Sequence, residues 1–240
     1  MELAERLRRL AIAAADLVAP GMRVGLGTGS TADAVTRELG RRVAEGLIFT
    51  AVPTSDRTEA LARDLGIPLA TLDETDRLDL GIDGADEIDP TLDAIKGRGG
   101  ALLREKLVAL SCDEYVLVAT TEKSVDQLGA RTPLPIEIVA FGWPQTAKRL
   151  ASIGLAAQER TVDDEPGRPW ITDNGGVIVD CTTGPIDDPS ELAAAIKAVS
   201  GVVEHGLFLD IARAALQVDA EGQVVRRERA GLDLRNCRRS

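Results

Sequence analysis

The stretch GMRVGLGTGSTADAVTRELGRRVAEG, residues 21–46, predicts a strand, a glycine turn and a helix in immediate succession. Ser30 and Thr31 stand where a hydroxyl caps the start of a helix. The backbone N–H groups of such a turn, with the hydroxyls of Thr28, Ser30 and Thr31, can point at one anion. The stretch therefore predicts the first βα unit of an α/β fold with a phosphate site at its turn, and a plain capped turn is the alternative.

This turn does not match the common nucleotide-binding motifs. Ser30 stands where the third glycine of G-x-G-x-x-G is required, and the next strand ends in Pro53 and Thr54 without an acid for a ribose. The turn also lacks the Gly-Lys-Ser/Thr sequence of a nucleotide P-loop. A small, local anion site is the interpretation that these residues favour.

Strands and helices alternate along the first half of the chain. Strand-like segments at residues 47–53, 77–83 and 114–120 are separated by helix-like segments at residues 54–66 and 100–110. Such alternation predicts βαβ units, a parallel sheet and right-handed crossovers.

The pattern changes after residues 129–144, which are rich in glycine and proline. Two helix-like runs, residues 145–153 and 189–200, flank a hairpin in which the pair Asn174-Gly175 favours a primed turn. The resulting order, β-α-β-β-α-β, is typical of a split βαβ, ferredoxin-like sandwich.

Two domains are therefore predicted. Residues 1–131 and 206–240 form a Rossmann-like open parallel-sheet domain that binds substrate and carries the catalytic residues. Residues 132–205 form a smaller α+β domain, expected to serve oligomerisation. The final RNCRRS, residues 235–240, is interpreted as a solvated basic end.

Composition excludes several classes of function. Aromatic residues make up 2% of the 240 residues and the net charge is −11, so nucleic acid and anionic membranes are not expected partners. The three cysteines lack metal or disulfide spacing, which favours a reducing cytoplasm. Residues 1–20 form an amphipathic helical pattern and not a signal peptide. The single histidine, His205, has no serine or cysteine partner at a nucleophile spacing and is expected to be structural.

The segment GIDGADEIDP, residues 81–90, gathers four carboxylates at the end of a strand. A calcium loop does not match, because proline stands where a bidentate glutamate is required. A magnesium phosphoryl-transfer site lacks its companion signatures. Turn capping is the remaining structural alternative, and it suits Asp89. Asp83 and Asp86 are expected to bind the hydroxyls of a ligand. Glu87 has no assigned role.

The segment IKGRGGALLREK, residues 95–106, reverses the local charge of this acidic chain. Its glycines allow a backbone to approach a ligand, Lys96 can neutralise a negative oxygen, and Glu105 falls near the first turn of a helix. A solvated charged helix face is the alternative. Because GTGST, PTSDRT and DGADE each follow a strand, these loops are expected to meet at one edge of the sheet.

Seven blocks, in this order, closely resemble ribose-5-phosphate isomerases of the A type: GLGTGSTA, PTSDRTEALA, DGADEIDP, KGRGGALLREK, TEKSVDQLG, PLPIEIV and TDNGG. The resemblance covers nearly the whole chain. It implies interconversion of D-ribose 5-phosphate and D-ribulose 5-phosphate in the non-oxidative pentose phosphate pathway. It also implies a cytoplasmic homodimer or dimer of dimers that uses no metal and no organic cofactor. A related amino-sugar phosphate deaminase and a phosphosugar-sensing regulatory domain are the alternatives.

The resemblance also implies roles for individual residues. The catalytic set is Glu105 as the base that moves a proton through an enediolate, Lys96 as the group that stabilises its oxyanion, and Asp83 as the acceptor of hydroxyl protons during ring opening. The substrate-binding set is Thr28, Gly29, Ser30, Thr31, Asp83, Gly84, Ala85, Asp86, Lys96, Gly97, Arg98, Gly99 and Lys123. Many members carry a phosphate-binding lysine in the first helix where this chain has Leu7, so the residue that completes the phosphate site stays open.

Overall fold

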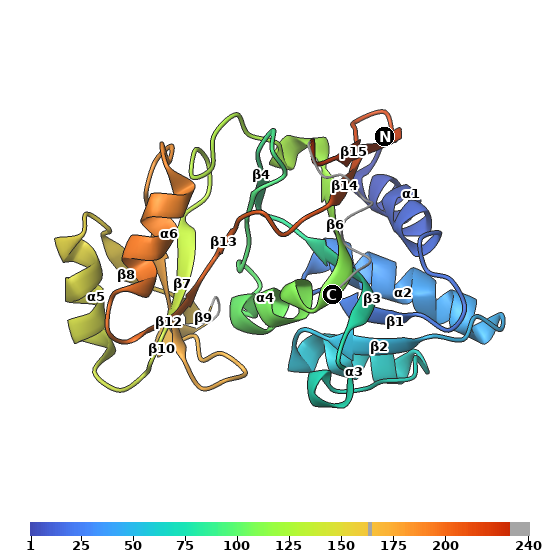
Figure 1. Ribbon diagram of the computed structural model, residues 1–240, viewed down its shortest axis with the longest axis horizontal. Helices are drawn as coiled ribbons and strands as arrows, with labels where there is room; N and C mark the ends of the chain where they lie inside the picture. The colour runs from blue at the N-terminus through green and yellow to red at the C-terminus, as the bar shows by residue number, and fades with distance from the viewer. Residues whose placement is uncertain (163–164, 231–240) are drawn as a thin grey trace.

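The computed structural model describes residues 1–162 and 165–230, and its main sheet is a parallel α/β sheet (Figure 1). Its strand order is β15-β14-β6-β3-β1-β2, in which neighbours are parallel except for the β14–β15 pair. The strands are β1 (Arg23–Leu26), β2 (Thr50–Pro53), β3 (Leu78–Gly84), β6 (Cys112–Thr120), β14 (Ala214–Val218) and β15 (Val224–Glu228). The helices that alternate with them are α1 (Leu3–Ala15), α2 (Ser30–Ala44), α3 (Asp56–Asp64) and α4 (Leu102–Leu110).

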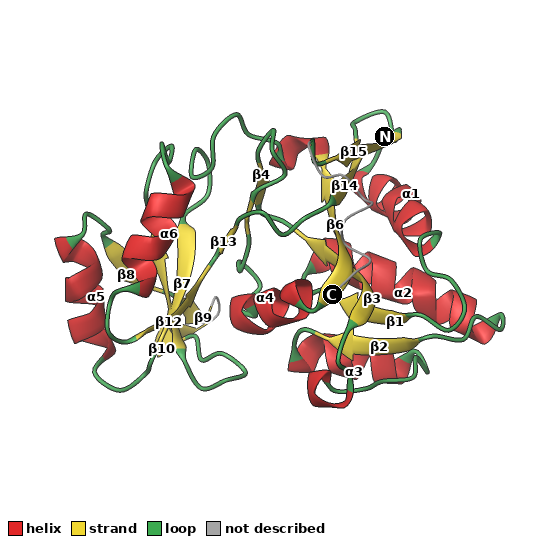
Figure 2. Ribbon diagram, viewed as in Figure 1, coloured by secondary structure: helices red, strands yellow, loops and turns green. Residues whose placement is uncertain are grey.

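Helices pack on both faces of this sheet. Alternate residues of β6 separate cleanly: Val116 and Val118 join the core under α1, α2 and α3, whereas Tyr115 and Leu117 join the core that contains Ala109 of α4. This separation follows from the two-residue period of a strand. The helix α4 consequently lies on the opposite face, between the large sheet and the second sheet (Figure 2).

The second sheet is antiparallel, with the order β12-β7-β11-β8. Its elements in chain order are β7 (Leu134–Ile138), α5 (Trp143–Ser152), β8 (Ala157–Glu159), β11 (Val177–Cys181), α6 (Pro189–Lys197) and β12 (Val202–His205). This is the predicted β-α-β-β-α-β order, and its apolar residues form a separate core. The predicted fold class, a Rossmann-like parallel sheet with a smaller ferredoxin-like unit, is confirmed.

The predicted hairpin around Asn174 and Gly175 is wrong in detail. The strand β11 pairs with β7 and β8, whereas the residues before the turn contribute only the isolated bridge Ile171–Val177. Only Gly175 has a positive φ, of 79°, so the turn is not of the primed type. The Thr172 hydroxyl accepts hydrogen bonds from the N–H groups of Gly176 and Asn174, a local pattern that competes with strand pairing.

Three short strands join the two sheets. They are β4 (Glu87–Ile88), β5 (Ala94–Ile95) and β13 (Leu207–Phe208), in the order β13-β5-β4. After β13 the chain returns to the large sheet as β14 and β15, as predicted. A two-stranded ribbon pairs β9 (Thr161–Val162) with β10 (Glu165–Pro169), and the remaining elements are the single turns η1 (Leu72–Glu74) and η2 (Thr121–Lys123).

Within the described ranges, no helix is long and apolar enough to cross a membrane. The predicted basic end, residues 235–240 with Cys237, lies outside the described residues.

Candidate active site

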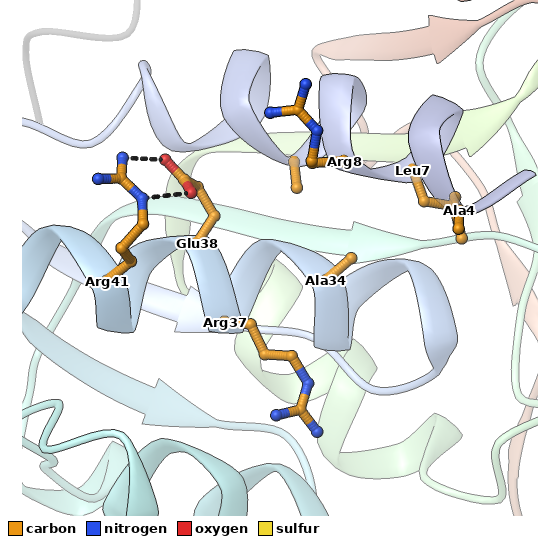
Figure 3. A pocket seen from close by; sticks show the side chains of 8 residues that line it. Ala4, Leu7, Arg8, Ala34, Arg37, Glu38 and Arg41 are labelled. Carbon is orange, nitrogen blue, oxygen red and sulfur yellow. Dashed lines mark hydrogen bonds and ion pairs between the residues drawn. The ribbon is translucent and has the colours of Figure 1, made fainter.

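Two cavities stand out in the structure, and they differ in chemistry. A cavity of about 380 Å³ lies between α1 and α2, where Leu7 and alanines form the floor and arginines the rim (Figure 3). Arg41 at that rim is already paired with Glu38. The residues that line this groove include no buried cluster of charged side chains. Leu7 lines this groove and not the second cavity.

The second cavity, of about 330 Å³, lies where β1, β3 and β6 end. It is lined by Thr28, Gly29, Ser30, Thr31, Arg57, Gly84, Ala85, Asp86, Lys96, Gly97, Arg98, Gly99, Glu105 and Lys123. Every residue of the predicted site except Asp83 is therefore brought to this one cavity. The carboxyl edge of a parallel sheet is where ligands bind in open α/β folds, so this cavity is the candidate active site.

A buried ion cluster forms the inner end of the cavity. The Nζ atom of Lys96 lies 3.0 Å from Oδ2 of Asp83 and 3.3 Å from Oε2 of Glu105. All three side chains are at most 2% exposed. Lys96 also donates a hydrogen bond to the carbonyl oxygen of Gly84. One lysine thus lies between two buried carboxylates and partly compensates the cost of burying them.

Asp83 lies behind the cavity wall and holds several groups in place. Its Oδ1 accepts hydrogen bonds from the N–H groups of Thr28, at 3.1 Å, and Gly84, at 2.7 Å. Its Oδ2 accepts one from the hydroxyl of Tyr115 at 3.2 Å. The close approach of Gly27 to the Asp83 side chain leaves no space for a Cβ atom there. Asp83 therefore ties the end of β3 to the turn that follows β1.

Burial sets the protonation of this cluster. Burial raises the pKa of Glu105 to about 8, although the nearby Lys96 opposes the shift. Burial also raises the pKa of Asp83, again against Lys96. For Lys96 itself, burial lowers the pKa, but the charges of Asp83 and Glu105 outweigh that effect and the net shift is upward. The lysine is therefore charged at neutral pH, whereas Glu105 titrates near it.

One oxygen of Glu105 accepts no hydrogen bond within the described part of the chain. Among the described residues, no donor forms a hydrogen bond to its buried Oε2; the contact with Lys96 at 3.3 Å is an ion pair only. Glu105 lies in the first turn of α4, and its carboxylate lines the cavity. A carboxylate with a raised pKa and a free lone pair beside a fixed cation is equipped to accept and return a proton.

The turn after β1 supplies the opposite end of the cavity. Gly29, with a φ of 114°, precedes α2, and Ser30 and Thr31 form its first turn. The hydroxyl of Thr28 was expected to face a ligand, but it is engaged by Thr54, Ser55 and Thr58 in a buried hydroxyl cluster. The cavity therefore meets α2 through its N-terminus and the hydroxyl-bearing residues Ser30 and Thr31.

Cationic side chains line the cavity together with this helix N-terminus. Arg98 and Lys123 line the cavity, and neither side chain has a hydrogen bond or ion pair within the described residues. Arg57, which the sequence did not single out, lines the same end and pairs with Asp33 of α2. The only feature of the sequence that could have indicated a site residue here is the position of Arg57 shortly after a strand, in PTSDRT. Positive charge and a helix N-terminus on one cavity suit an anion, in a chain of net charge −11.

The remaining acids of GIDGADEIDP separate by role. Asp89 caps its turn as predicted, because Oδ1 accepts hydrogen bonds from the N–H groups of Thr91 and Asp93. Glu87 is 1% exposed. Its carboxylate accepts three hydrogen bonds, from the backbone N–H groups of Gly129, Arg131 and Thr132. Glu87 thus anchors the segment that leads into the second sheet, a role that sequence alone did not indicate.

His205 has a structural role, as its buried contacts indicate. It is 6% exposed, burial lowers its pKa to about 4, and its carbonyl oxygen accepts a hydrogen bond from Lys106 at 2.7 Å. Lys106 also pairs with Glu204 at 2.8 Å. This group joins α4 to β12 and lies outside the cavity.

The donor set does not assemble a metal site within the part of the chain that the structure describes: no three His, Cys, Asp or Glu side chains converge. Asp83 and Glu105 do come together, but the ammonium of Lys96 lies between them. A lysine at this place supplies the positive charge that a metal would otherwise bring to the two carboxylates.

Comparison with known proteins agrees with this geometry. Residues 50–222 match the family model for ribose 5-phosphate isomerase A, also called phosphoriboisomerase A. The ribose-5-phosphate isomerase A of Roseiflexus castenholzii is 52% identical over 90% of this chain and 93% of its own length. That of Synechococcus is 50% identical over 92% of this chain and 97% of its own.

Solved structures show the same fold. Ribose 5-phosphate isomerase A from Methanocaldococcus jannaschii has a TM-score of 0.88 and 38% identity, covering 95% of this chain and all of that one. A D-ribose-5-phosphate isomerase in complex with phospho-erythronic acid has a TM-score of 0.90 and 36% identity over the same shares. Identity at this level across nearly the full length, with the cavity and its charged cluster in place, means that the chain belongs to the ribose 5-phosphate isomerase A family.

Proposed function

We propose that this chain catalyses the interconversion of D-ribose 5-phosphate and D-ribulose 5-phosphate, an aldose-ketose isomerisation of the pentose phosphate pathway. The observation that carries the proposal is the position of Glu105. Its buried Oε2 accepts no hydrogen bond from the described residues and lies 3.3 Å from the Lys96 ammonium, and Glu105 lines a cavity that Arg57, Arg98 and Lys123 also line. Family membership gives the reaction, and this arrangement supplies its chemical groups.

Glu105 is the proposed base. It takes the proton from C2 of the open-chain aldose and returns it to C1. In the same conversion the C1 carbonyl becomes, through an enediolate, a C1 hydroxyl and the C2 hydroxyl becomes a carbonyl, so one proton also passes from O2 to O1. The raised pKa of Glu105 suits both halves of this transfer, because a group with a pKa near the working pH accepts and returns protons readily.

Lys96 is the proposed stabiliser of the enediolate oxygen. Its ammonium already contacts Asp83, Glu105 and the Gly84 carbonyl oxygen. We propose that a substrate oxygen takes the place of one of these partners. The contact with Glu105 is the longer of the two ion pairs. If Lys96 gives up this contact, the Glu105 carboxylate can also accept a proton from the substrate. Fixed charge in a dry site stabilises a developing oxyanion without reorganisation of solvent.

Asp83 is the proposed acceptor of hydroxyl protons when the furanose opens. Burial raises its pKa, which lets it hold a proton transiently. Because Asp83 does not line the cavity, this role requires the hydroxyl to enter beside Lys96 Nζ. Asp86, which does line the cavity, is proposed to bind a sugar hydroxyl together with Gly84, Ala85 and the glycine turn.

The phosphate is proposed to lie against Ser30 and Thr31 at the start of α2. Lys123 and Arg98 line the same cavity and have no ion pair among the described residues, and Arg57 of α3 lines it as well. Since Leu7 lines a different groove, these cations are the candidates for the charge that a first-helix lysine supplies in many relatives.

The wider assignments stay proposals as well. We place the enzyme in the cytoplasm as a homodimer or dimer of dimers, without metal or organic cofactor and without a nucleic-acid partner. Residues 1–131 and 206–240 would form the catalytic domain, and residues 132–205 a domain that serves oligomerisation.

The test is isomerase activity of the purified chain. Ribose 5-phosphate should be converted to ribulose 5-phosphate until both reach equilibrium, whereas ribose without phosphate should react poorly. Glucosamine 6-phosphate should release no ammonia, which separates an isomerase from an amino-sugar phosphate deaminase. Tight binding of ribose 5-phosphate without turnover would instead support a sensing domain, a reading that the comparisons do not favour.

A further inference from the structure

The glycine turn beside the cavity is tied to the second sheet. Residues 97–100 follow Lys96, and three of them line the cavity. Gly97 and Gly100 have φ values of 106° and 82°, which L side chains rarely adopt. The Gly100 N–H closes the turn with a hydrogen bond to the Gly97 carbonyl oxygen at 3.0 Å. The turn has few side chains of its own, so its position relative to the cavity depends on hydrogen bonds from its surroundings.

One arginine makes the hydrogen bonds on the far side of the turn. Arg160 lies between β8 and β9, and its Nη1 donates to the carbonyl oxygens of Gly97, at 2.8 Å, and Arg98, at 3.0 Å. Among the described residues, no other side chain donates to these two carbonyls. The ring of Trp170 packs against the same turn: a Cβ atom on Gly100 would lie 2.4 Å from its Nε1.

Arg160 is itself fixed. Its Nε donates to Oδ2 of Asp180 on β11 at 2.8 Å, and its Nη2 pairs with the other oxygen of the same carboxylate. The two side chains are only 14% and 24% exposed. Bidentate pairing of this kind sets the plane of the guanidinium, so the third nitrogen points at the turn in one orientation.

This contact orients the opposite side of the peptide toward the cavity. In a trans peptide the C=O and N–H groups point in opposite directions. The N–H of Arg98, opposite the Gly97 carbonyl, donates to Oδ2 of Asp86 at 3.1 Å. The N–H of Gly99, opposite the Arg98 carbonyl, has no acceptor within the described chain, and Gly99 lines the cavity.

We infer that Arg160, held by Asp180, is a positioning residue for the isomerase: it fixes the glycine turn so that the Gly99 N–H and the Arg98 side chain face the phosphosugar. The inference rests on the proposed function and extends it, because it makes the smaller unit part of the substrate site. Lys96 is held separately by Asp83, Glu105 and Gly84, so the reacting groups do not depend on Arg160.

The test compares Arg160→Ala with Arg149→Ala, an exposed arginine of the same unit. For Arg160→Ala, the KM for ribose 5-phosphate should rise about tenfold or more while kcat stays within about threefold, since uniform binding is lost and the base and cation are kept. The pH profile should keep its position. Amide hydrogen exchange should increase at residues 97–100 and not in β7 or β11. Arg149→Ala should match the wild type in all of these.

Two further variants keep the inference testable if Arg160→Ala folds poorly. Arg160→Lys and Asp180→Asn should give intermediate KM values, because each weakens the orientation of the guanidinium or ammonium without removing the charge next to the turn. Wild-type KM in Arg160→Ala would overturn the inference. So would a fall in kcat that follows the melting temperature across all three variants, which would mark a structural role. If the wild type itself fails to isomerise ribose 5-phosphate, the proposed function fails instead.

Discussion

The ammonium of Lys96 lies 3.3 Å from Oε2 of Glu105, and both side chains are 2% exposed. This pair places a fixed positive charge beside a carboxylate whose pKa burial raises to about 8. In the proposed reaction the Lys96 ammonium moves its contact from Glu105 to the substrate oxygen.

The first prediction concerns pH. The Glu105 base must be deprotonated, and its pKa is raised to about 8 by burial, so kcat/KM for ribose 5-phosphate should rise with pH and level off above that value. Below it, the rate should fall about tenfold per pH unit. A profile of kcat/KM that is flat between pH 6 and 9 would contradict this assignment.

The same shift has a consequence for stability. The folded-state pKa of Glu105 lies above its unfolded value of 4.5, so the folded protein binds more protons between these values. The wild type should therefore lose stability relative to Glu105→Gln as pH rises from 4.5 to about 8. Thermal unfolding of both proteins across this pH range measures the difference between their stabilities. A difference that stays constant with pH would contradict the raised pKa of Glu105.

The second prediction concerns Lys96. Lys96→Met removes the cation from two buried carboxylates, so it should lower kcat by about 10² to 10³-fold, the usual loss for an oxyanion-stabilising group. It should also lower the melting temperature, because Asp83 and Glu105 are left buried without their counter-ion. Lys148→Met, at an exposed lysine of α5, is the matched control and should leave both unchanged. Retention of kcat in Lys96→Met would show that the lysine is not part of the chemistry.

The third prediction concerns the wall of the cavity. Gly100→Ala adds a Cβ atom 2.4 Å from Nε1 of Trp170 and keeps a φ of 82°, so the glycine turn or the indole must move. The KM for ribose 5-phosphate should rise. Gly154→Ala is the control, because it has a φ of 89° with no atom near the added Cβ. It should cost about 1 kcal/mol of stability from backbone strain and leave the kinetics unchanged. Equal kinetics in the two variants would exclude the packing argument.

The fourth prediction concerns metal. The Lys96 ammonium lies between the two carboxylates that would hold an ion, so excess EDTA should leave the isomerisation rate unchanged. The assay uses protein dialysed against the chelator. Loss of activity that Mg²⁺, Mn²⁺ or Zn²⁺ restores would contradict a mechanism that depends on lysine alone.

Much of the site followed from local sequence. The ends of β1 and β3 were predictable because strand-like runs stop at GTGST and DGADE, and parallel strands bring such ends to one edge. Lys96 and Glu105 were predictable from KGRGGALLREK, where one reversal of charge meets a glycine turn. The prediction that Asp89 caps its turn was also correct, because an aspartate before a proline commonly binds the backbone N–H groups that follow it.

The remainder depends on contacts between distant segments. Glu87 anchors the backbone around Gly129, Arg160 reaches the glycine turn from 62 residues away, and Tyr115 donates to Asp83 across the sheet. No local pattern indicates such partners. The hydroxyl of Thr28 was misplaced for a related reason: its partners come from the loop after β2. The primed turn predicted for Asn174 and Gly175 was wrong, because the hydroxyl of Thr172 binds the backbone of the turn and only Gly175 of the pair has a positive φ.

The most direct test of the central claim is the rate of ribose 5-phosphate isomerisation by Glu105→Gln, with Glu191→Gln, at an exposed glutamate of α6, as the matched control. Phospho-erythronic acid, the ligand of a solved relative, serves as the probe of binding. The account predicts a loss in kcat of about 10² to 10⁴-fold for Glu105→Gln, with retained binding of that probe and a wild-type rate for Glu191→Gln. A Glu105→Gln protein that isomerises within a few-fold of the wild-type rate would contradict it.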